Sequence, residues 1–86
     1  MTNKEFWQLK RGDVIIDEMR DRTMKIIKRT VENEVVGMII SKKTTIDILN
    51  GRKYVQLTLK DMQQNNTYYY DSTRPDKLKY LKKVNL

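Results

Sequence analysis

The sequence predicts a mainly β fold of short antiparallel strands, and a turn signal in the middle of the chain is the first reason. Asn50-Gly51 separates two runs in which apolar and polar residues alternate. Both residues tolerate the positive φ angles that a two-residue hairpin turn requires. Such a turn would pair position 46 with position 55 and put the aliphatic side chains of both runs on one face of the sheet. We therefore expect strands near 44–49 and 52–60 to form a hairpin.

A second hairpin is predicted just upstream. Val31-Glu32-Asn33 fits a three-residue loop with Asn33 in the left-handed position. This loop would pair position 26 with position 38. The run from Val35 to Ser41 is apolar on both faces, which is typical of a central, well-covered strand. Gly37 within it indicates a bulge, a bend or a close backbone approach, and a barrel corner is the favoured interpretation.

Composition is the third reason. The chain has no Ala, which helical bundles use for close packing, whereas its Ile, Val, Thr and Tyr favour strands. The 86 residues are expected to form one domain, 1–86, with a single modest core. The absence of Cys excludes disulfides and thiolate metal sites, and the absence of His removes the commonest general base and metal ligand. No metal or other cofactor is expected.

A short helix is expected near the N-terminal end, over about 3–11. Thr2-Asn3-Lys4-Glu5 has the spacing of a capping box, in which the first and last side chains satisfy each other's free backbone donors. Phe6 and Leu9 would then share one face, and Gly12 would end the helix. An extended arm is the alternative interpretation.

The other elements are assigned from the same kinds of pattern. In chain order they are a strand from Val14 to about Met19, a charged turn at 20–22, a strand at 23–30, a polar loop at 63–66, a short strand at 68–70, a helical turn that buries Leu78 and Leu81, and closing residues Val84 and Leu86.

The segment Leu9-Lys10-Arg11-Gly12-Asp13-Val14-Ile15-Ile16, with the strand meander behind it, resembles the opening of SH3-like small β-barrels. Barrels of the KOW and Tudor type and MazF-type ribonuclease toxins often start with such a Gly-Asp-Val step. The resemblance implies a small SH3-like antiparallel barrel or a strongly bent sheet of five to six strands. It also implies a short helical turn before the last strand, here 76–81. It selects no function, because its members bind RNA, DNA, methylated tails or proteins, and no MazF active site maps onto this chain.

No catalytic residue is expected. The chain has no Gly-rich phosphate loop and no zincin motif. Its two serines, Ser41 and Ser72, have no His to act as a base, and Ser41 and Lys42 would point to opposite faces of a strand. The carboxylates between Asp13 and Asp21 are interpreted as dispersed surface charges rather than as a Mg²⁺ site. The sequence therefore predicts a non-enzymatic binding domain.

Charge is the main functional signal. The chain carries 18 Lys plus Arg against 11 Asp plus Glu, a net charge of +7, which attracts nucleic acid, nucleotides or acidic protein surfaces. Alternation places exposed cations beside Tyr54, whose ring can stack on a base while the cations meet phosphates. We therefore expect a nucleic-acid-binding accessory protein, although a solvated face is the alternative for the C-terminal lysines. The candidate residues are Lys25, Arg29, Lys42, Lys43, Arg52, Tyr54, Lys60, Lys79, Lys82 and Lys83.

Two other functions stay open. Val35, Ile39 and Leu49 face outward by the same alternation, which favours a protein-interaction module that docks on a host protein. An added strand along a sheet edge would be its contact mode. The weaker alternative is a sponge for an anionic nucleotide, which would use the same cations and Tyr rings. Heavy use of Lys, Asn, Ile and Tyr is compatible with AT-rich coding, as in a phage or another mobile element.

The sequence indicates no contact with a membrane. No apolar run approaches the roughly 20 residues that span a bilayer. The N-terminal residues lack the apolar stretch of a secretory signal. A cytoplasmic location is therefore expected.

Overall fold

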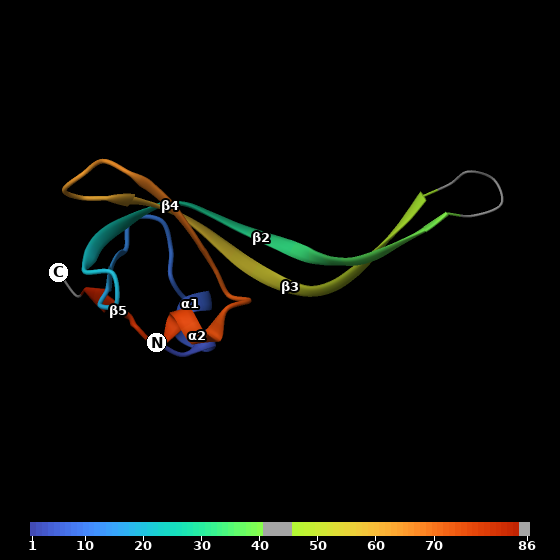
Figure 1. Cartoon of the computed structure of the whole chain (residues 1–86), viewed down its shortest axis with the longest axis horizontal. Helices are drawn as coiled ribbons and strands as arrows, with labels where there is room; N and C mark the ends of the chain where they lie inside the picture. Colours follow the sequence, from blue (N-terminus) through green and yellow to red (C-terminus); the bar gives the residue numbers. More distant parts are fainter. Residues whose placement is uncertain (41–45, 85–86) are drawn as a thin grey trace.

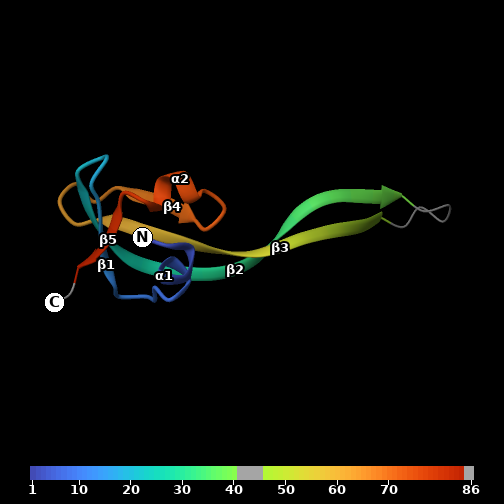
Figure 2. The same cartoon turned by 90° about the horizontal axis from the view of Figure 1, so that it is seen from below.

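The computed structural model describes residues 1–40 and 46–84, with side chains for residues 1–34 and 51–84. Five strands form one antiparallel sheet in the order β4-β3-β2-β1-β5, and two short helices lie at the compact end of the molecule (Figures 1 and 2). The mainly β fold class is therefore confirmed. The elements are α1 (Asn3–Trp7), β1 (Val14–Asp17), β2 (Arg22–Ile40), β3 (Ile46–Asp61), β4 (Thr67–Asp71), α2 (Pro75–Leu78) and β5 (Leu81–Val84).

β2 and β3 form one long hairpin that extends away from the rest of the molecule (Figure 1). The two predicted short hairpins are therefore wrong. Asn50-Gly51 lies inside β3, where Ile46 pairs with Ile40 rather than with position 55. Residues 31–33 lie inside β2, and position 26 pairs with Leu59 rather than with position 38.

The turn-forming residues mark register shifts in this long hairpin instead of turns. Residues 50–53 of β3 lie opposite the shorter stretch 33–35 of β2, so β3 holds one extra residue between Asn50 and Lys53, directly after the predicted turn. A second shift lies between Val35 and Gly37, which confirms Gly37 as the mark of a bulge. A bulge leaves two residues opposite one and so changes which positions face the core farther along the strand. The change of alternation at Asn50-Gly51 therefore comes from a bulge in a continuous strand.

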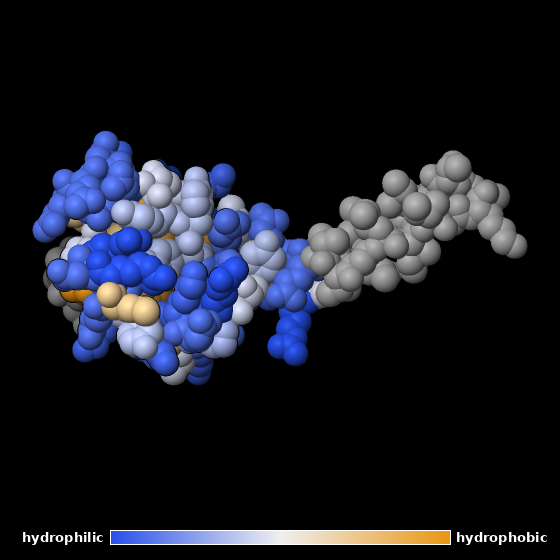
Figure 3. Space-filling model, in the orientation of Figure 1, coloured by the Kyte–Doolittle hydropathy of each residue, from blue (hydrophilic) through white to orange (hydrophobic). Residues whose placement is uncertain are grey.

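The core lies inside the bent part of the sheet, where the two helices cover it. The alternation predicted for 24–26 and 55–59 is confirmed here, because Met24 and Ile26 of β2 and Leu57 and Leu59 of β3 are fully buried in one cluster. The face of this compact end that Figure 3 shows is mostly hydrophilic. The apolar side chains of the core are Phe6, Leu9, Ile15, Met24, Ile26, Val55, Leu57, Leu59, Tyr70, Leu78 and Leu81.

The N-terminal helix is present but shorter than predicted. The capping box is confirmed, since the Glu5 amide donates to Thr2 Oγ1 at 3.1 Å and the Thr2 amide donates to Glu5 Oε1 at 3.0 Å. α1 ends at Trp7 rather than near residue 11, and Gly12 belongs to the turn that follows. Its φ of 95° suits glycine, and its amide donates to the Ile26 carbonyl at 2.8 Å. This bond ties the turn to β2.

The smaller elements lie close to their predicted positions. β1 starts at Val14, and the turn after it spans residues 18–21 rather than 20–22. β4 contains the three consecutive tyrosines, and α2 starts at Pro75. Leu81 is buried as expected, but it opens β5, which pairs with β1. Leu86 lies outside the described residues.

The sheet is strongly bent but not closed. β4 and β5 are its two edges, and they do not pair with each other within residues 1–40 and 46–84. β4 and β1, which are not neighbours in the sheet, are joined by side chains, because Tyr70 Oη donates to Asp17 Oδ2 at 2.5 Å. The closed barrel is therefore not confirmed, whereas the bent antiparallel sheet is.

The absence of Cys from the chain allows a direct test of the register of the long hairpin. Thr30 lies opposite Gln56, so Thr30→Cys with Gln56→Cys places two Cα atoms at about 4.5–5.5 Å, within the range of a disulfide. We expect this pair to oxidise quantitatively, and we expect little oxidation of the diagonal pair Thr30→Cys with Thr58→Cys. Mass spectrometry of the oxidised variants measures the yields, and the reverse preference would contradict the register.

Candidate nucleic-acid interface

One face of β2, β3 and β4 turns away from the core, and we call it the outer face. Val55, Leu57 and Leu59 of β3 are fully buried, so the alternating residues between and beyond them point to the opposite side. The alternation predicted for 52–60 is therefore confirmed, whereas that predicted for 44–49 lies outside the described side chains. The β3 residues on this outer face are Arg52, Tyr54, Gln56, Thr58 and Lys60.

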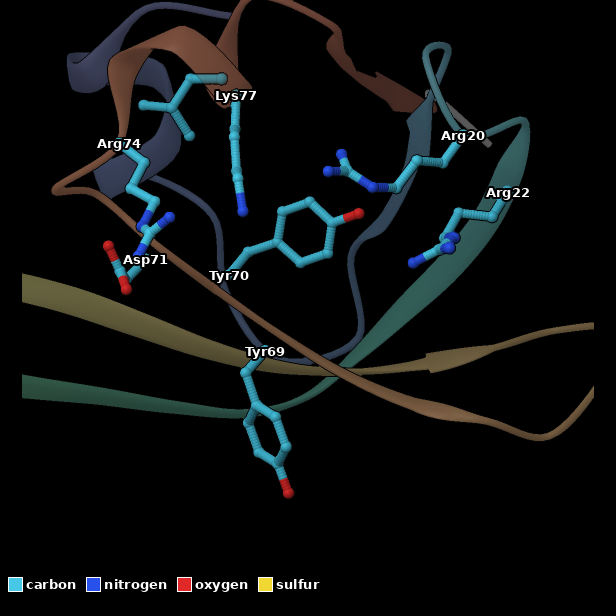
Figure 4. Close-up of a pocket in the computed structure, with 8 residues that line it drawn as sticks. Arg20, Arg22, Tyr69, Tyr70, Asp71, Arg74 and Lys77 are labelled. Carbon is cyan, nitrogen blue, oxygen red and sulfur yellow. The ribbon is translucent and has the colours of Figure 1, made fainter.

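Lysines and one tyrosine gather on the outer face near the edge strand. Lys25 of β2 lies directly opposite Lys60 of β3, and both side chains are exposed. In the next row, Thr58 lies between Lys28 of β2 and Tyr69 of β4. Tyr69 is 67% exposed, and Figure 4 shows it pointing to the opposite side of β4 from Tyr70. We call Lys25, Lys28, Lys60 and Tyr69 the lysine–tyrosine cluster.

The electrostatics of this cluster are unfavourable without a counter-ion. Like charges placed directly opposite each other destabilise an antiparallel pair. Among the described residues, no carboxylate lies within ion-pair distance of Lys25, Lys28 or Lys60. A bound anion would relieve this repulsion.

Arg29 is exposed, as expected, but a bulge separates it from Lys25. The register shifts between Ile26 and Lys28, and Arg29 lies opposite the buried Leu57. Its guanidinium donates to the Trp7 carbonyl at 2.9 Å. Arg29 therefore ties α1 to β2, and it does not share a surface with Lys25.

Arg52 and Tyr54 lie together in a groove that the sequence did not indicate. A cavity of about 380 Å³ is bounded by these two residues and by Lys53, Trp7 and Glu34, together with Asn3, Ser72, Thr73 and Pro75. Tyr54 and Trp7 are half-buried there. Sequence reasoning missed Trp7 because its place beside β3 depends on how α1 packs.

The C-terminal lysines have local partners. Lys82 Nζ lies 2.8 Å from Glu18 Oε1, and this hydrogen bond raises the pKa of Lys82. Lys83 Nζ lies 3.7 Å from Asp13 Oδ2, and Lys79 Nζ lies 5.0 Å from the centre of the Tyr80 ring. These contacts favour the solvated face over a phosphate-binding ridge, although a role in binding stays a prediction.

Five of the candidates lie where side chains are not described. Lys42 and Lys43 fall outside the described residues. The side chains of Val35, Ile39 and Leu49 do so too, although their backbone belongs to β2 and β3. The outward direction predicted for these three residues stays a prediction.

A second cavity, on the inner side of β4, collects cations from distant parts of the chain. It has a volume of about 340 Å³, and Figure 4 shows the side chains around it. We call the group Arg20, Arg22, Arg74 and Lys77 around the Tyr70 ring the basic pocket. Its other lining residues are Tyr69, Asp71 and Leu78. This site could not be found from the sequence, because residues 20–22 were interpreted as a charged turn. Only the bend of the sheet brings this turn close to α2.

Behind the basic pocket lies a buried hydrogen-bond centre. Asp17 is fully buried and accepts bonds from Tyr70 Oη at 2.5 Å, Arg20 Nη1 at 3.1 Å and the Met19 amide at 3.0 Å. Burial disfavours its charge, but the bonds from Tyr70 and Arg20 outweigh that cost and hold the pKa of Asp17 below its usual value. Burial and the bond to Asp17 raise the pKa of Tyr70 to about 12. Asp17 is therefore charged and Tyr70 neutral at pH 7.

The fold and its surfaces define a small, mainly β domain with a basic outer face and a separate basic pocket. No protein-family model matches the chain, and no curated protein and no solved structure matches it either. Neither helix in the described part of the chain is long and apolar enough to cross a membrane. Among the side chains described, those of residues 1–34 and 51–84, no group of three or more Asp and Glu residues could hold a metal ion.

Proposed function

We propose that this chain is a non-enzymatic domain that binds single-stranded nucleic acid along the outer face of its sheet. The observation that carries the proposal is the pair Lys25 and Lys60, two exposed cations held directly opposite each other without a carboxylate partner among the described residues. Phosphates of a nucleic-acid backbone supply the missing negative charge.

The arrangement of side chains around this pair supports binding of a nucleic-acid strand that runs along β3. From Lys60 to Arg52 the outer face runs for about 26 Å, at roughly 3.3 Å per residue. Tyr69 lies beside the lysines at one end, and Tyr54 lies toward the other. Exposed rings stack on bases regardless of sequence, so cations with aromatic side chains favour binding without strong sequence preference. Glu32 lies opposite Tyr54, so the attraction for phosphates is strongest around Lys25 and Lys60.

The SH3-like resemblance belongs to the same proposal. Strands β1 to β4 follow one another as a meander, β5 returns to β1, and α2 directly precedes β5. This order supports an open variant of the small-barrel architecture that the Gly12-Asp13-Val14 step suggested.

We expect Lys25→Gln with Lys60→Gln to weaken binding of a fluorescent 12-nucleotide poly-dT strand about tenfold at 50 mM salt. Loss of two phosphate contacts should also lower the slope of log K against log salt by about 1.4. Tyr69→Ala should weaken binding by a further factor of about five or more with no change in slope, because stacking releases no counter-ion. Fluorescence anisotropy from 50 to 300 mM KCl measures both quantities.

The control is Lys4→Gln with Lys10→Gln, which removes the same charge from exposed positions off the outer face. This variant should keep the wild-type slope within about 0.3. Equal losses in the two double variants would mean that net charge alone attracts the strand, and the outer-face proposal would then be abandoned. Wild-type protein that leaves the anisotropy unchanged at tens of micromolar would overturn the function itself.

A protein partner is the second candidate, and the open edges of the sheet favour it. β4 and β5 each lack a strand neighbour on one side within the described residues, so each can accept an added strand. A stoichiometric protein that co-purifies with the natively expressed chain would support this candidate, whereas nucleic acid released by a high-salt wash would support the first.

A further inference from the structure

We propose that the basic pocket is a binding site for a phosphomonoester, a group that carries close to two negative charges at neutral pH. The four cations of the pocket lie on the inner side of β4, whereas Lys25, Lys28 and Lys60 lie on the outer face. Tyr69 borders the pocket, but its ring points to the opposite side of β4 from Tyr70 (Figure 4). The two sites therefore share no cation, and phosphate binding in the pocket does not depend on the lysines of the outer face.

Cations outnumber carboxylates around the cavity, although Arg20 is paired with the buried Asp17 behind it. Four cations line it, and the single carboxylate in the described lining, Asp71, accepts bonds from the amide and the hydroxyl of Thr73. Among the described side chains, Asp71 forms no ion pair with any of the four cations. Figure 4 shows Arg20 and Arg22 on the hydroxyl side of Tyr70 and Lys77 reaching toward the ring from α2. The cavity therefore presents several donors to one small anion.

Two of the arginines are held in place before any ligand arrives. Arg22 stacks on the Tyr68 ring, with its guanidinium carbon 3.8 Å from the ring centre. Arg20 is anchored through Nη1 to the buried Asp17, which leaves its other donors unused by that bond. Planar guanidinium groups bind phosphate oxygens in pairs, so fixing them in advance lowers the entropy lost on binding.

The size and lining of the cavity limit the ligand to a small one. Its volume of about 340 Å³ lies at the lower end of the range for small-molecule sites. The ring of Tyr70 and the side chain of Leu78 give it one apolar wall. The Tyr70 hydroxyl already donates its hydrogen bond to Asp17, so Tyr70 offers the ligand the face of its ring. A phosphate attached to one small organic group, such as a nucleoside or the end of a nucleic-acid strand, matches these limits.

The test is a titration of ¹⁵N-labelled protein with inorganic phosphate at constant ionic strength, followed by amide NMR shifts. We expect saturable shifts confined to residues 20–22, 70–71 and 74–78. Arg74→Gln with Lys77→Gln should weaken this binding at least about tenfold, since both side chains are exposed or half-buried and neither forms an ion pair with a described residue. Shifts spread evenly over the surface, or unchanged affinity in this variant, would overturn the proposal. If the variant does not fold, the wild-type shift map alone decides.

Two further arms identify the source of the phosphate. A nucleoside 5′-monophosphate that binds more tightly than inorganic phosphate assigns the site to free nucleotides. A 5′-phosphorylated trinucleotide that binds more tightly than its 5′-hydroxyl form, with the nucleoside monophosphate no better than inorganic phosphate, assigns it to strand ends. Binding of all these phosphates that is equally strong in Arg74→Gln with Lys77→Gln overturns the site.

The same titration separates this proposal from the proposed function. Lys25→Gln with Lys60→Gln alters the outer face alone and should bind inorganic phosphate like the wild type. Conversely, Arg74→Gln with Lys77→Gln should keep the salt slope for poly-dT. A negative result for nucleic-acid binding on the outer face would therefore not overturn the phosphate site in the basic pocket. A negative result for the phosphate site would likewise not overturn the proposed function.

Discussion

Leu57→Ala is expected to lower the free energy of unfolding by about 2–5 kcal/mol, the range for truncating a fully buried leucine. Leu57 lies between β2 and β4, opposite Arg29 and Tyr70, and its removal leaves a cavity that the bent sheet cannot collapse to fill. A domain of this size has a total stability of roughly 4–13 kcal/mol. The variant should therefore lose a large fraction of the stability of the fold and unfold at a clearly lower urea concentration than the wild type.

The matched control is Gln56→Ala, the neighbouring position on the outer face of the same strand. This change should cost less than about 1 kcal/mol, because no buried contact is lost. Urea unfolding followed by circular dichroism gives both values, and equal m-values would confirm that the unfolded states are comparable. Similar losses at positions 56 and 57 would contradict the assignment of the two faces of β3.

Tyr70→Phe is expected to cost about 1.5–3 kcal/mol, the range for a hydrogen bond to a charged group. The change keeps the ring but removes the hydroxyl that donates to Asp17 at 2.5 Å, and Asp17 stays fully buried with one donor fewer. For a domain of this length the melting temperature should fall by about 6 °C or more. Tyr69→Phe, which lies on the opposite side of β4, should leave it unchanged.

The pH dependence of this cost has a defined sign. The pKa of Tyr70 is raised to about 12 in the folded protein, whereas it is near 10 in an unfolded chain. Its contribution is fully present below pH 10 and is lost as the pH rises toward 12, so the gap between wild type and Tyr70→Phe should narrow by about 2–3 kcal/mol over that interval. On the acid side, the pKa of Asp17 is lower in the folded protein than in the unfolded chain. The charged carboxylate therefore stabilises the fold at pH values above the unfolded-state pKa, and this contribution is lost as the pH falls through the folded-state pKa. Urea unfolding at pH 3–12 checks both limbs, and a constant gap would contradict the buried bond.

Local signals in the sequence predicted the elements that depend on neighbouring residues. The capping box at Thr2, the start of β1 at Val14, the strand of three tyrosines and the burial of Leu78 all follow from spacings of a few residues. The alternation along β3 was predicted as well, because burial of every second side chain is independent of the partner strand.

The pairing of β2 with β3 was harder to predict, because a turn and a bulge produce the same pattern in the sequence. Both change the alternation of apolar residues, and both are favoured by the residues found at Asn50-Gly51. A two-residue turn at Asn50-Gly51 costs less loop-closure entropy than the longer connection between β2 and β3, so local reasoning from the sequence favours the turn. The choice of one long hairpin is made by contacts distant in sequence, such as the pairing of Met24 with Asp61.

The residues of the candidate sites also fall into those that local patterns predict and those that depend on the tertiary fold. The cations of β3 were predicted because they follow from alternation, whereas the place of Arg29 was altered by the bulge at Ile27. The basic pocket could not be found from the sequence, since Arg20 and Lys77 are brought together by the bend of the sheet and the bond between Tyr70 and Asp17.

The protruding β2–β3 hairpin also governs how the molecule behaves in solution. The Cα radius of gyration is 16.1 Å, and the principal extents are 55 × 25 × 20 Å, whereas a spherical chain of this length has a radius of gyration of about 12 Å. A value near 16 Å is what a rounded protein of twice the mass would have. A single copy will therefore migrate through a sizing column like a dimer, and an absolute mass from light scattering is needed to count its subunits.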